Sequence, residues 1–184
     1  IEKFKKGKYE NYILSVARLV SAKRVDILAK SMNYVKNKKV KLYIVGDGSE
    51  KEKIKKITEK NLKIKLINYV SDEELTKLYS NCLAAVYIPV NEDFGFVPIE
   101  AGASGKATIG ADEGGLKETI INGQTGFLIK KVTPQNIAKK IDYFINHKNL
   151  AKKMGINAEK YVRKFNWKII LEEFDKNLRE VVGK

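Results

Sequence analysis

Cysteine, histidine and proline are scarce in this chain of 184 residues, which has one Cys, one His and three Pro. Cys82 alone cannot form an internal disulfide, and His147 alone cannot build a zinc cluster or a cysteine–histidine catalytic pair. No apolar run reaches the roughly 18 residues that a membrane-spanning helix needs, and residues 1–8 show no apolar core of a secretory signal. We therefore expect a cytoplasmic protein.

Acidic side chains are also in the minority, because 36 Lys and Arg face 22 Asp and Glu and give a net charge of +14. A basic nucleic-acid-binding protein is one interpretation. However, the lysines are scattered and alternate with glutamates, as in residues 50–53, and no basic block with interleaved aromatic residues stands out. We expect most of them to be solvated or to attract phosphate ligands or anionic lipid headgroups, which would place the full-length protein peripherally on a membrane.

Apolar runs of strand length alternate with longer amphipathic runs along most of the chain. This pattern predicts an α/β protein with about six parallel strands, covered by helices on both faces of a doubly wound, Rossmann-like sheet. The predicted strands are residues 12–17, 40–45, 64–69, 83–88, 107–109 and 126–129. The predicted helices are residues 25–35, 49–58, 71–80, a helix from Pro98, and residues 116–121.

The remainder of the chain, from Thr133 to Val182, reads as a helical tail with breaks near residues 146–149 and near Asn166. Its last segment, from Trp167, repeats apolar residues at helical spacing, which is typical of a core or an interface. We see no linker or internal repeat, so residues 1–184 are expected to form a single domain.

Two carboxylates eight positions apart, Glu92 and Glu100, bracket a predicted strand–loop–helix junction. Pro89 ends the preceding apolar run, Gly95 relieves the turn, and Pro98 suits the first turn of a helix. The free N–H groups of that helix would face the carboxyl edge of the sheet, where anionic phosphates bind. Carboxylates accept paired hydrogen bonds from vicinal diols, so we expect a ligand with sugar hydroxyls flanking a phosphate.

Two other motifs carry little weight on their own. Residues 93–95, Asp-Phe-Gly, match the magnesium-binding tripeptide of protein kinases, but no His-Arg-Asp precedes them. Residues 46–48, Gly-Asp-Gly, begin like a dinucleotide-binding fingerprint, but Lys51 stands where the third glycine belongs.

Four motifs in order resemble the C-terminal half of retaining glycosyltransferases with the GT-B fold, specifically glycosyltransferase family 4, the group 1 glycosyl transferases. They are residues 15–19 followed by Lys23, residues 45–48, the acid pair enclosing Phe-Gly, and residues 114–118 leading to residues 122–128. The resemblance covers nearly the whole chain. It implies that this chain is the donor-binding domain, one half of a GT-B fold, and that the N-terminal acceptor-binding domain lies outside it.

The resemblance also implies roles for three candidate catalytic residues. Arg18 and Lys23 would hold the donor diphosphate and neutralise the charge on the leaving group, and Glu92 would lie near hydroxyls of the transferred sugar. The alternative for the two cations is ordinary surface charge. Because these cations can neutralise the phosphates, no metal and no cofactor is expected.

The donor-binding residues implied by the resemblance surround the same junction. Glu100 would bind the ribose hydroxyls, the alternative being a helix carboxylate paired with a lysine. Backbone amides next to the sugar and phosphates would come from Phe94, Gly95, Phe96 and Val97. The walls of the nucleobase pocket would come from Gly46 and the turn with Tyr69 and Val70, with a core or turn role as the alternative.

The residues around the acid pair are similar to those of mannosyltransferase-like members, so the favoured donor is GDP-mannose, with transfer of mannose to an acceptor. The alternative function is a non-catalytic nucleotide-sugar-binding module or subunit. The helix from Trp167 resembles the helix that crosses to the N-terminal domain, so its exposed apolar face would favour self-association. At Gly102 the family commonly has Met, and this departure concerns the packing of the helix more than the chemistry of the site.

Overall fold

Six short strands form one fully parallel sheet in the computed structural model, which describes residues 3–182. The strands are β1 (Tyr12–Val16), β2 (Lys41–Val45), β3 (Ile64–Ile67), β4 (Ala84–Tyr87), β5 (Thr108–Ala111) and β6 (Gly126–Ile129). Their order, β3-β2-β1-β4-β5-β6, confirms the predicted doubly wound sheet. Of the predicted domain, residues 1, 2, 183 and 184 lie outside the described part.

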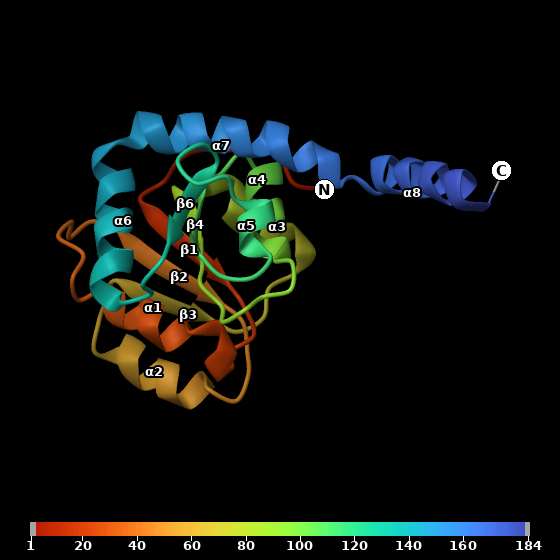
Figure 1. Cartoon of the computed structure of the whole chain (residues 1–184). Helices are drawn as coiled ribbons and strands as arrows, with labels where there is room; N and C mark the ends of the chain where they lie inside the picture. The colour runs from red at the N-terminus through yellow and green to blue at the C-terminus, as the bar shows by residue number, and fades with distance from the viewer. Residues whose placement is uncertain (1–2, 183–184) are drawn as a thin grey trace.

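Helices cover both faces of the sheet (Figure 1), and the central strands β1 and β4 are buried on both faces. Successive residues of β1 enter opposite cores: Ile13 packs in one cluster with Leu28 and Ile141, and Leu14 packs in the other with Tyr79 and Ile99. This is the reason that the central strands read as apolar runs without alternation, whereas the edge strand β3 carries the exposed Lys65.

The first core is covered by α1 (Val25–Ser31), α2 (Lys51–Glu59) and α6 (Pro134–Asn146), and the second by α3 (Asp72–Asn81) and α4 (Phe96–Ala103). Helix α7 (Lys148–Val162) packs on α4, and α5 (Leu116–Thr119) is a single turn. The predicted helices are therefore confirmed, with differences at several ends: α4 begins at Phe96 and α5 ends at Thr119. Helix α1 stops at Ser31 and not at residue 35, although Val35 remains buried.

Helix ends follow the local sequence signals. At α3 the Ser71 hydroxyl accepts the Glu74 N–H (3.2 Å) while the Glu74 carboxylate accepts the Ser71 N–H (2.9 Å), which is a complete capping box. At α6 the Thr133 hydroxyl accepts the Asn136 N–H (3.2 Å), and Pro134 occupies the first turn. The predicted break in the tail falls at His147, between α6 and α7.

Helix α8 (Trp167–Val182) follows a short 3-10 turn, η2 (Arg163–Phe165), and projects away from the rest of the chain (Figure 1). None of its residues is buried, and Trp167 is 72% exposed and Phe174 is 59% exposed. The exposed apolar stripe is as predicted, and self-association through it stays a prediction. Within residues 3–182 no helix has the length and apolar character that crossing a membrane requires.

Small residues let α4 and α7 approach closely. A Cβ atom placed on Gly102 would lie 2.6 Å from Val162 Cγ1 and 3.2 Å from the Ala158 carbonyl oxygen. A Cβ atom on Gly155 would lie 2.0 Å from the Gly105 carbonyl oxygen. Gly102 therefore leaves no gap, because α7 occupies the space that a larger side chain would fill.

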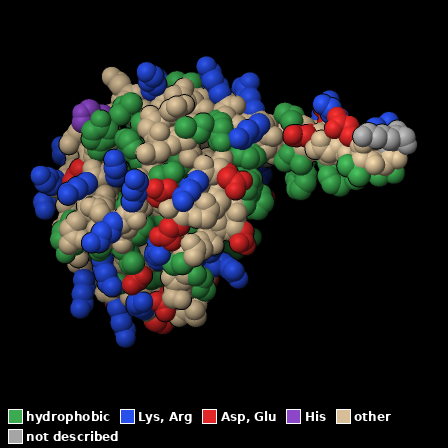
Figure 2. Space-filling view, viewed as in Figure 1, with side chains coloured by type: hydrophobic (Ala, Val, Ile, Leu, Met, Phe, Trp, Pro, Cys, Tyr) green, Lys and Arg blue, Asp and Glu red, His purple; other side chains and the backbone are tan. Residues whose placement is uncertain are grey.

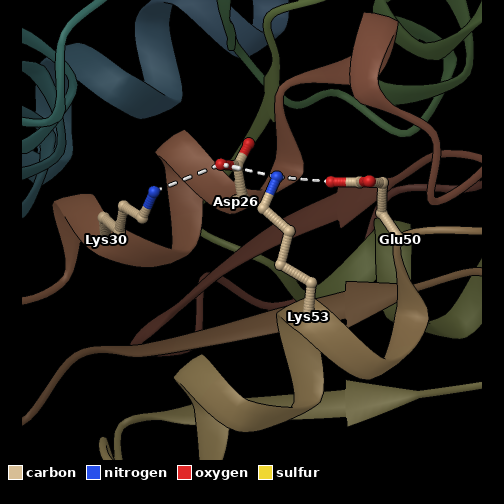
Figure 3. Close-up of polar contacts among 4 residues, drawn as sticks. All are labelled: Asp26, Lys30, Glu50 and Lys53. Atoms are coloured by element: carbon tan, nitrogen blue, oxygen red, sulfur yellow. Dashed lines mark hydrogen bonds and ion pairs between the residues drawn. The ribbon is translucent and has the colours of Figure 1, made fainter.

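A polar network joins α1 to the start of α2 (Figure 3). The Asp26 carboxylate lies 3.3 Å from Lys30 Nζ and 3.4 Å from Lys53 Nζ, and Lys53 also contacts Glu50 (2.5 Å). Burial alone would raise the pKa of Asp26, but the two ammonium groups outweigh it and lower the pKa. Because the Glu50 N–H donates to the Leu19 carbonyl (2.7 Å), this network fixes the loop after β2 beside the loop after β1.

Candidate functional site

The strand order reverses between β1 and β4, which pair directly through Ile13 and Ala84. In open α/β sheets this switch point, at the carboxyl ends of the strands, leaves a crevice for ligands. The loops that leave β1, β2, β3 and β4 carry every predicted site residue except Glu100, Phe96 and Val97, which belong to α4. The fold therefore brings segments that are far apart in the sequence to one edge.

The loops after β1 and β2 lie in direct contact at this edge. A Cβ atom on Gly46, whose φ is 151°, would lie 1.9 Å from the Ala17 carbonyl oxygen, so only glycine fits. The Leu19 N–H donates to the Asp47 carbonyl (2.8 Å). The Gly-Asp-Gly sequence thus serves a close approach between two loops.

A pocket of about 310 Å³ opens between the ends of β1, β2 and β3. It is lined by Val16, Ala17, Arg18, Val45, Gly46, Asp47, Asn68, Tyr69, Val70 and Leu75. Four of the predicted site residues, namely Arg18, Gly46, Tyr69 and Val70, therefore share one pocket. Arg18 is exposed, and no carboxylate within residues 3–182 forms an ion pair with it.

Lys23, after β1, and Glu92, after β4, form an ion pair with side chains that are only 16% and 21% exposed. Lys23 ends a 3-10 turn, η1 (Ser21–Lys23), and its Nζ also donates to the Tyr87 hydroxyl (3.0 Å). Burial alone would lower the pKa of Lys23, but the hydrogen bonds to Glu92 and Tyr87 outweigh it and raise the pKa, so the ammonium stays charged at neutral pH. Two of the three predicted catalytic residues are thus in contact with each other.

A second ion pair is formed by Arg24, which follows Lys23 in the sequence. Arg24 has a left-handed backbone (φ 51°) and its Nη1 lies 2.9 Å from Glu113 Oε1. The turn that carries Glu92 is also held by two glycines. The Gly115 N–H donates to the Glu92 carbonyl (2.7 Å), and a Cβ atom on Gly114 would lie 2.3 Å from the same oxygen. Residues 114–115, Gly-Gly, therefore pack against the backbone of Glu92 and hold the turn that carries it in place.

The N-terminus of α4 offers backbone donors to this edge. Gly95, with φ 87°, precedes the helix, and no side chain caps it. The rings of Phe94 and Phe96 face elsewhere: with Trp167 and other residues they line a separate apolar cavity of about 550 Å³, and Phe94 meets Phe165 edge to face (5.3 Å). At residues 94–97 the backbone, at the positive end of the helix dipole, is what remains available to an anion.

Glu100 lies one turn further along α4 and faces α3. Its Oε2 accepts a hydrogen bond from the buried Tyr79 hydroxyl (2.8 Å). Burial raises the pKa of Glu100 although the Tyr79 hydroxyl opposes the rise, and burial also raises the pKa of Tyr79 well above its usual range. No lysine within residues 3–182 forms an ion pair with Glu100, although the charge of Lys3 also opposes the rise in its pKa.

Sequence reasoning missed the residues that orient the predicted ones: Tyr79, Tyr87, Arg24 and Glu113. Tyr79 and Tyr87 fall at apolar positions of a helix and a strand, where an aromatic residue reads as core. No local signal links Arg24 to Glu113, because 89 positions separate them. Within residues 3–182 no three His, Cys, Asp or Glu side chains are grouped so that they could hold a metal ion.

The family model described as "Glycosyl transferases group 1" matches residues 1–161. The chain belongs to this family. Its α/β sheet and C-terminal helices correspond to one half of a GT-B fold, as the resemblance implied.

Similar proteins agree with this assignment. The chain is 32% identical over 166 residues to an uncharacterized glycosyltransferase of Methanocaldococcus jannaschii, covering 89% of this chain and 46% of that protein. It is 35% identical over 134 residues to an alpha-1,3/1,6-mannosyltransferase of Dictyostelium discoideum, covering 73% of this chain and 31% of that protein. A crystal structure of an S. aureus TarM variant with Fondaparinux, alpha-GlcNAc-glycerol and UDP superposes with a TM-score of 0.85 and 27% identity, covering 94% of this chain and 36% of that one. The chain thus spans less than half the length of these proteins.

Proposed function

We propose that this chain is the donor-binding domain of a retaining glycosyltransferase, which binds a nucleoside diphosphate sugar at the carboxyl edge of its sheet. The observation that carries the proposal is the grouping of the Arg18 pocket, the Lys23–Glu92 pair and the uncapped N-terminus of α4 around one switch point. Cations and backbone donors suit a diphosphate, and carboxylates suit the hydroxyls on either side of it.

Each part of the ligand has a matching group. The pocket with Gly46, Tyr69 and Val70 would take the nucleobase, with Arg18 on the diphosphate at its rim. Glu100, oriented by Tyr79, would accept the ribose hydroxyls. On the other side of the diphosphate, Glu92 would accept hydroxyls of the transferred sugar while Lys23 stabilises charge on the leaving group.

The donor that we favour is GDP-mannose. Support comes from the mannosyltransferase-like residues around the acid pair and from the similarity to a named mannosyltransferase. The TarM structure contains UDP, so a uridine nucleotide is the competing donor class. The pocket offers backbone and aromatic walls to either base.

Transfer would need a second, acceptor-binding domain across the crevice, which this chain does not supply. The apolar stripe of α8, exposed at Ile170, Leu171 and Phe174, is the surface that such a domain would cover. A second copy of this chain is the competing partner for the stripe, which analytical ultracentrifugation would detect as a dimer.

Calorimetric titration with GDP, UDP, ADP and GDP-mannose, with and without magnesium, tests the proposal. We expect metal-independent binding of one nucleotide in preference to the others. Arg18→Ala should weaken binding of that nucleotide and of pyrophosphate alike, by roughly tenfold for the loss of one charge-assisted contact. Glu100→Ala should weaken binding of the nucleotide and leave binding of pyrophosphate nearly unchanged. Equal losses of affinity for both ligands would refute the role given to Glu100.

A further inference from the structure

A third cavity, of about 440 Å³, lies at the edge of the sheet between the end of β6 and α6. It is lined by Leu128, Ile129, Lys130, Lys131, Asn136, Lys139, Lys140 and Tyr143. Four of these are lysines, and no acidic residue is among them. Because β4 and β5 separate β6 from β1, this cavity is distinct from the pocket at Arg18.

Charge is segregated around this cavity. Residues 120–158 contain seven lysines (130, 131, 139, 140, 148, 152 and 153) and one acidic residue, Asp142. Within residues 3–182 none of these seven lysines forms an ion pair. Figure 2 shows many Lys and Arg side chains on the side of the molecule that α6 occupies in Figure 1. On α2 the lysines alternate with acids: Lys51 and Lys53 form ion pairs, whereas Lys55 and Lys56 form none within residues 3–182.

The one acid in this stretch does not neutralise the lysines. The Asp142 carboxylate accepts the backbone N–H groups of Lys36 (3.0 Å) and Asn37 (3.3 Å), so it holds the turn after α1. Lys140 Nζ lies 4.1 Å from the centre of the Phe127 ring, which fixes one ammonium next to the cavity. Ammonium groups gathered without counter-charges repel one another and destabilise the fold. An anionic ligand would relieve this repulsion.

We propose that the cavity between β6 and α6 binds the phosphate groups of an anionic ligand, supplied by a phospholipid headgroup or by a soluble phosphate ester. Lysine ammonium groups are compact charges that bind phosphate from several directions. The concave shape suits a headgroup or a small ester, and the exposed Tyr143 ring suits the membrane interface. A polynucleotide site would need several stacking rings, and Tyr143 is the one aromatic residue in the lining.

The test compares two variants with the same net charge. In the first, Lys130, Lys131, Lys139 and Lys140 are all changed to Gln. In the control, Lys55, Lys56, Lys60 and Lys65, which are exposed residues at the opposite edge of the sheet, are changed to Gln. Thermal unfolding checks that both variants fold.

One arm of the test is sedimentation with phosphatidylcholine vesicles, with and without phosphatidylglycerol. The other is NMR titration with inorganic pyrophosphate, which distinguishes amides of residues 128–143 from amides of the donor loops at residues 18–23 and 94–97. We expect the cavity variant to lose binding roughly a hundredfold in at least one arm, and the control to stay within about twofold. Loss only with vesicles identifies a lipid headgroup, and loss only with pyrophosphate identifies a soluble ester.

Three results would overturn the proposal. Equal losses in both variants would mean attraction by net charge alone. Pyrophosphate shifts confined to residues 18–23 and 94–97, without vesicle binding, would leave the cavity without a phosphate ligand and would instead support the donor site. Tight binding of single-stranded RNA that the cavity variant abolishes and that phosphate does not compete would identify a nucleic-acid site.

Discussion

Changing Tyr79 to Phe removes one hydroxyl from the candidate site and keeps the packing around it. The Tyr79 ring is fully buried and meets the Phe4 ring edge to face, with centroids 5.6 Å apart. Phe retains this ring. The only group lost is the hydroxyl that donates to Glu100 Oε2 over 2.8 Å. Tyr79→Phe therefore tests what one hydrogen bond does for the carboxylate that is expected to bind ribose.

The first expected effect is on stability. A hydrogen bond to a charged group contributes about 1.5–3 kcal/mol, and part of this is recovered when water reaches the carboxylate instead. Glu100 is only partly buried, so we expect the free energy of unfolding to fall by about 1–2 kcal/mol. Urea denaturation of the two proteins measures this difference.

The second effect is on the proton that Glu100 binds. Burial raises the pKa of Glu100 and the Tyr79 hydroxyl opposes the rise, so the pKa rises further in Tyr79→Phe. A protonated carboxyl group accepts fewer hydrogen bonds from hydroxyls. Nucleotide affinity should therefore fall as the pH falls through the raised pKa of Glu100, and in the variant this fall should begin at a higher pH.

Calorimetric titration across mildly acidic pH measures both profiles, with the nucleotide that the protein binds best. Pyrophosphate is the control ligand, since it has no ribose and its own protonation is the same with both proteins. Glu100→Gln is the control background, because an amide does not titrate in this range. If Tyr79→Phe shifted the profile by the same amount in the Glu100→Gln background, Glu100 would not be the titrating group and the reasoning would be refuted.

Two further predictions concern stability. Lys106 is fully buried, with Nζ 2.6 Å from the Lys8 carbonyl oxygen, and burial lowers its pKa from 10.5 to about 8. Above that pH the unfolded chain keeps a proton that the native protein has lost, so from about pH 8 to about pH 10 the native protein should gain about 2 kcal/mol relative to Lys106→Met. A constant difference in urea unfolding would contradict this. Gly102→Ala, whose new methyl group would lie 2.6 Å from Val162 Cγ1, should lower the free energy of unfolding by about 1–3 kcal/mol. Adding Val162→Ala should recover part of that loss in the same assay, and no recovery would place the clash elsewhere.

The fold was predictable where a local pattern is tied to burial. The apolar run at residues 83–88 became β4 because both of its faces are covered, and Ser71 with Glu74 capped α3 as their spacing indicates. The end of α1 was not predictable in this way. Its apolar period continues to Val35, but the backbone leaves the helix after Ser31 and the following turn still directs Val35 into the core.

The residues of the candidate site were also predictable only in part. Residues placed by the backbone, such as Gly46 at the contact of two loops, could be located from strand ends and glycines. The hydrogen-bond and ion-pair partners of the charged side chains could not be located in this way, because they depend on how the elements are arranged in the fold. Tyr79 comes from α3 to meet Glu100 on α4, and Arg24 meets Glu113 because the loop after β5 reaches the loop after β1.

The two predicted phosphate-binding cations at the carboxyl edge, Arg18 and Lys23, are not equally available to a ligand. This difference affects how a diphosphate would be bound. Arg18 is exposed at the rim of its pocket, whereas Lys23 is already held by Glu92 and Tyr87. A phosphate that approaches Lys23 has to separate a partly buried ion pair, and an unpartnered Glu92 is unfavourable unless it gains new donors. Sugar hydroxyls are such donors. A complete donor would thus satisfy both members of the pair, whereas a nucleotide without its sugar would satisfy only Lys23, so the pair itself favours the sugar-bearing ligand.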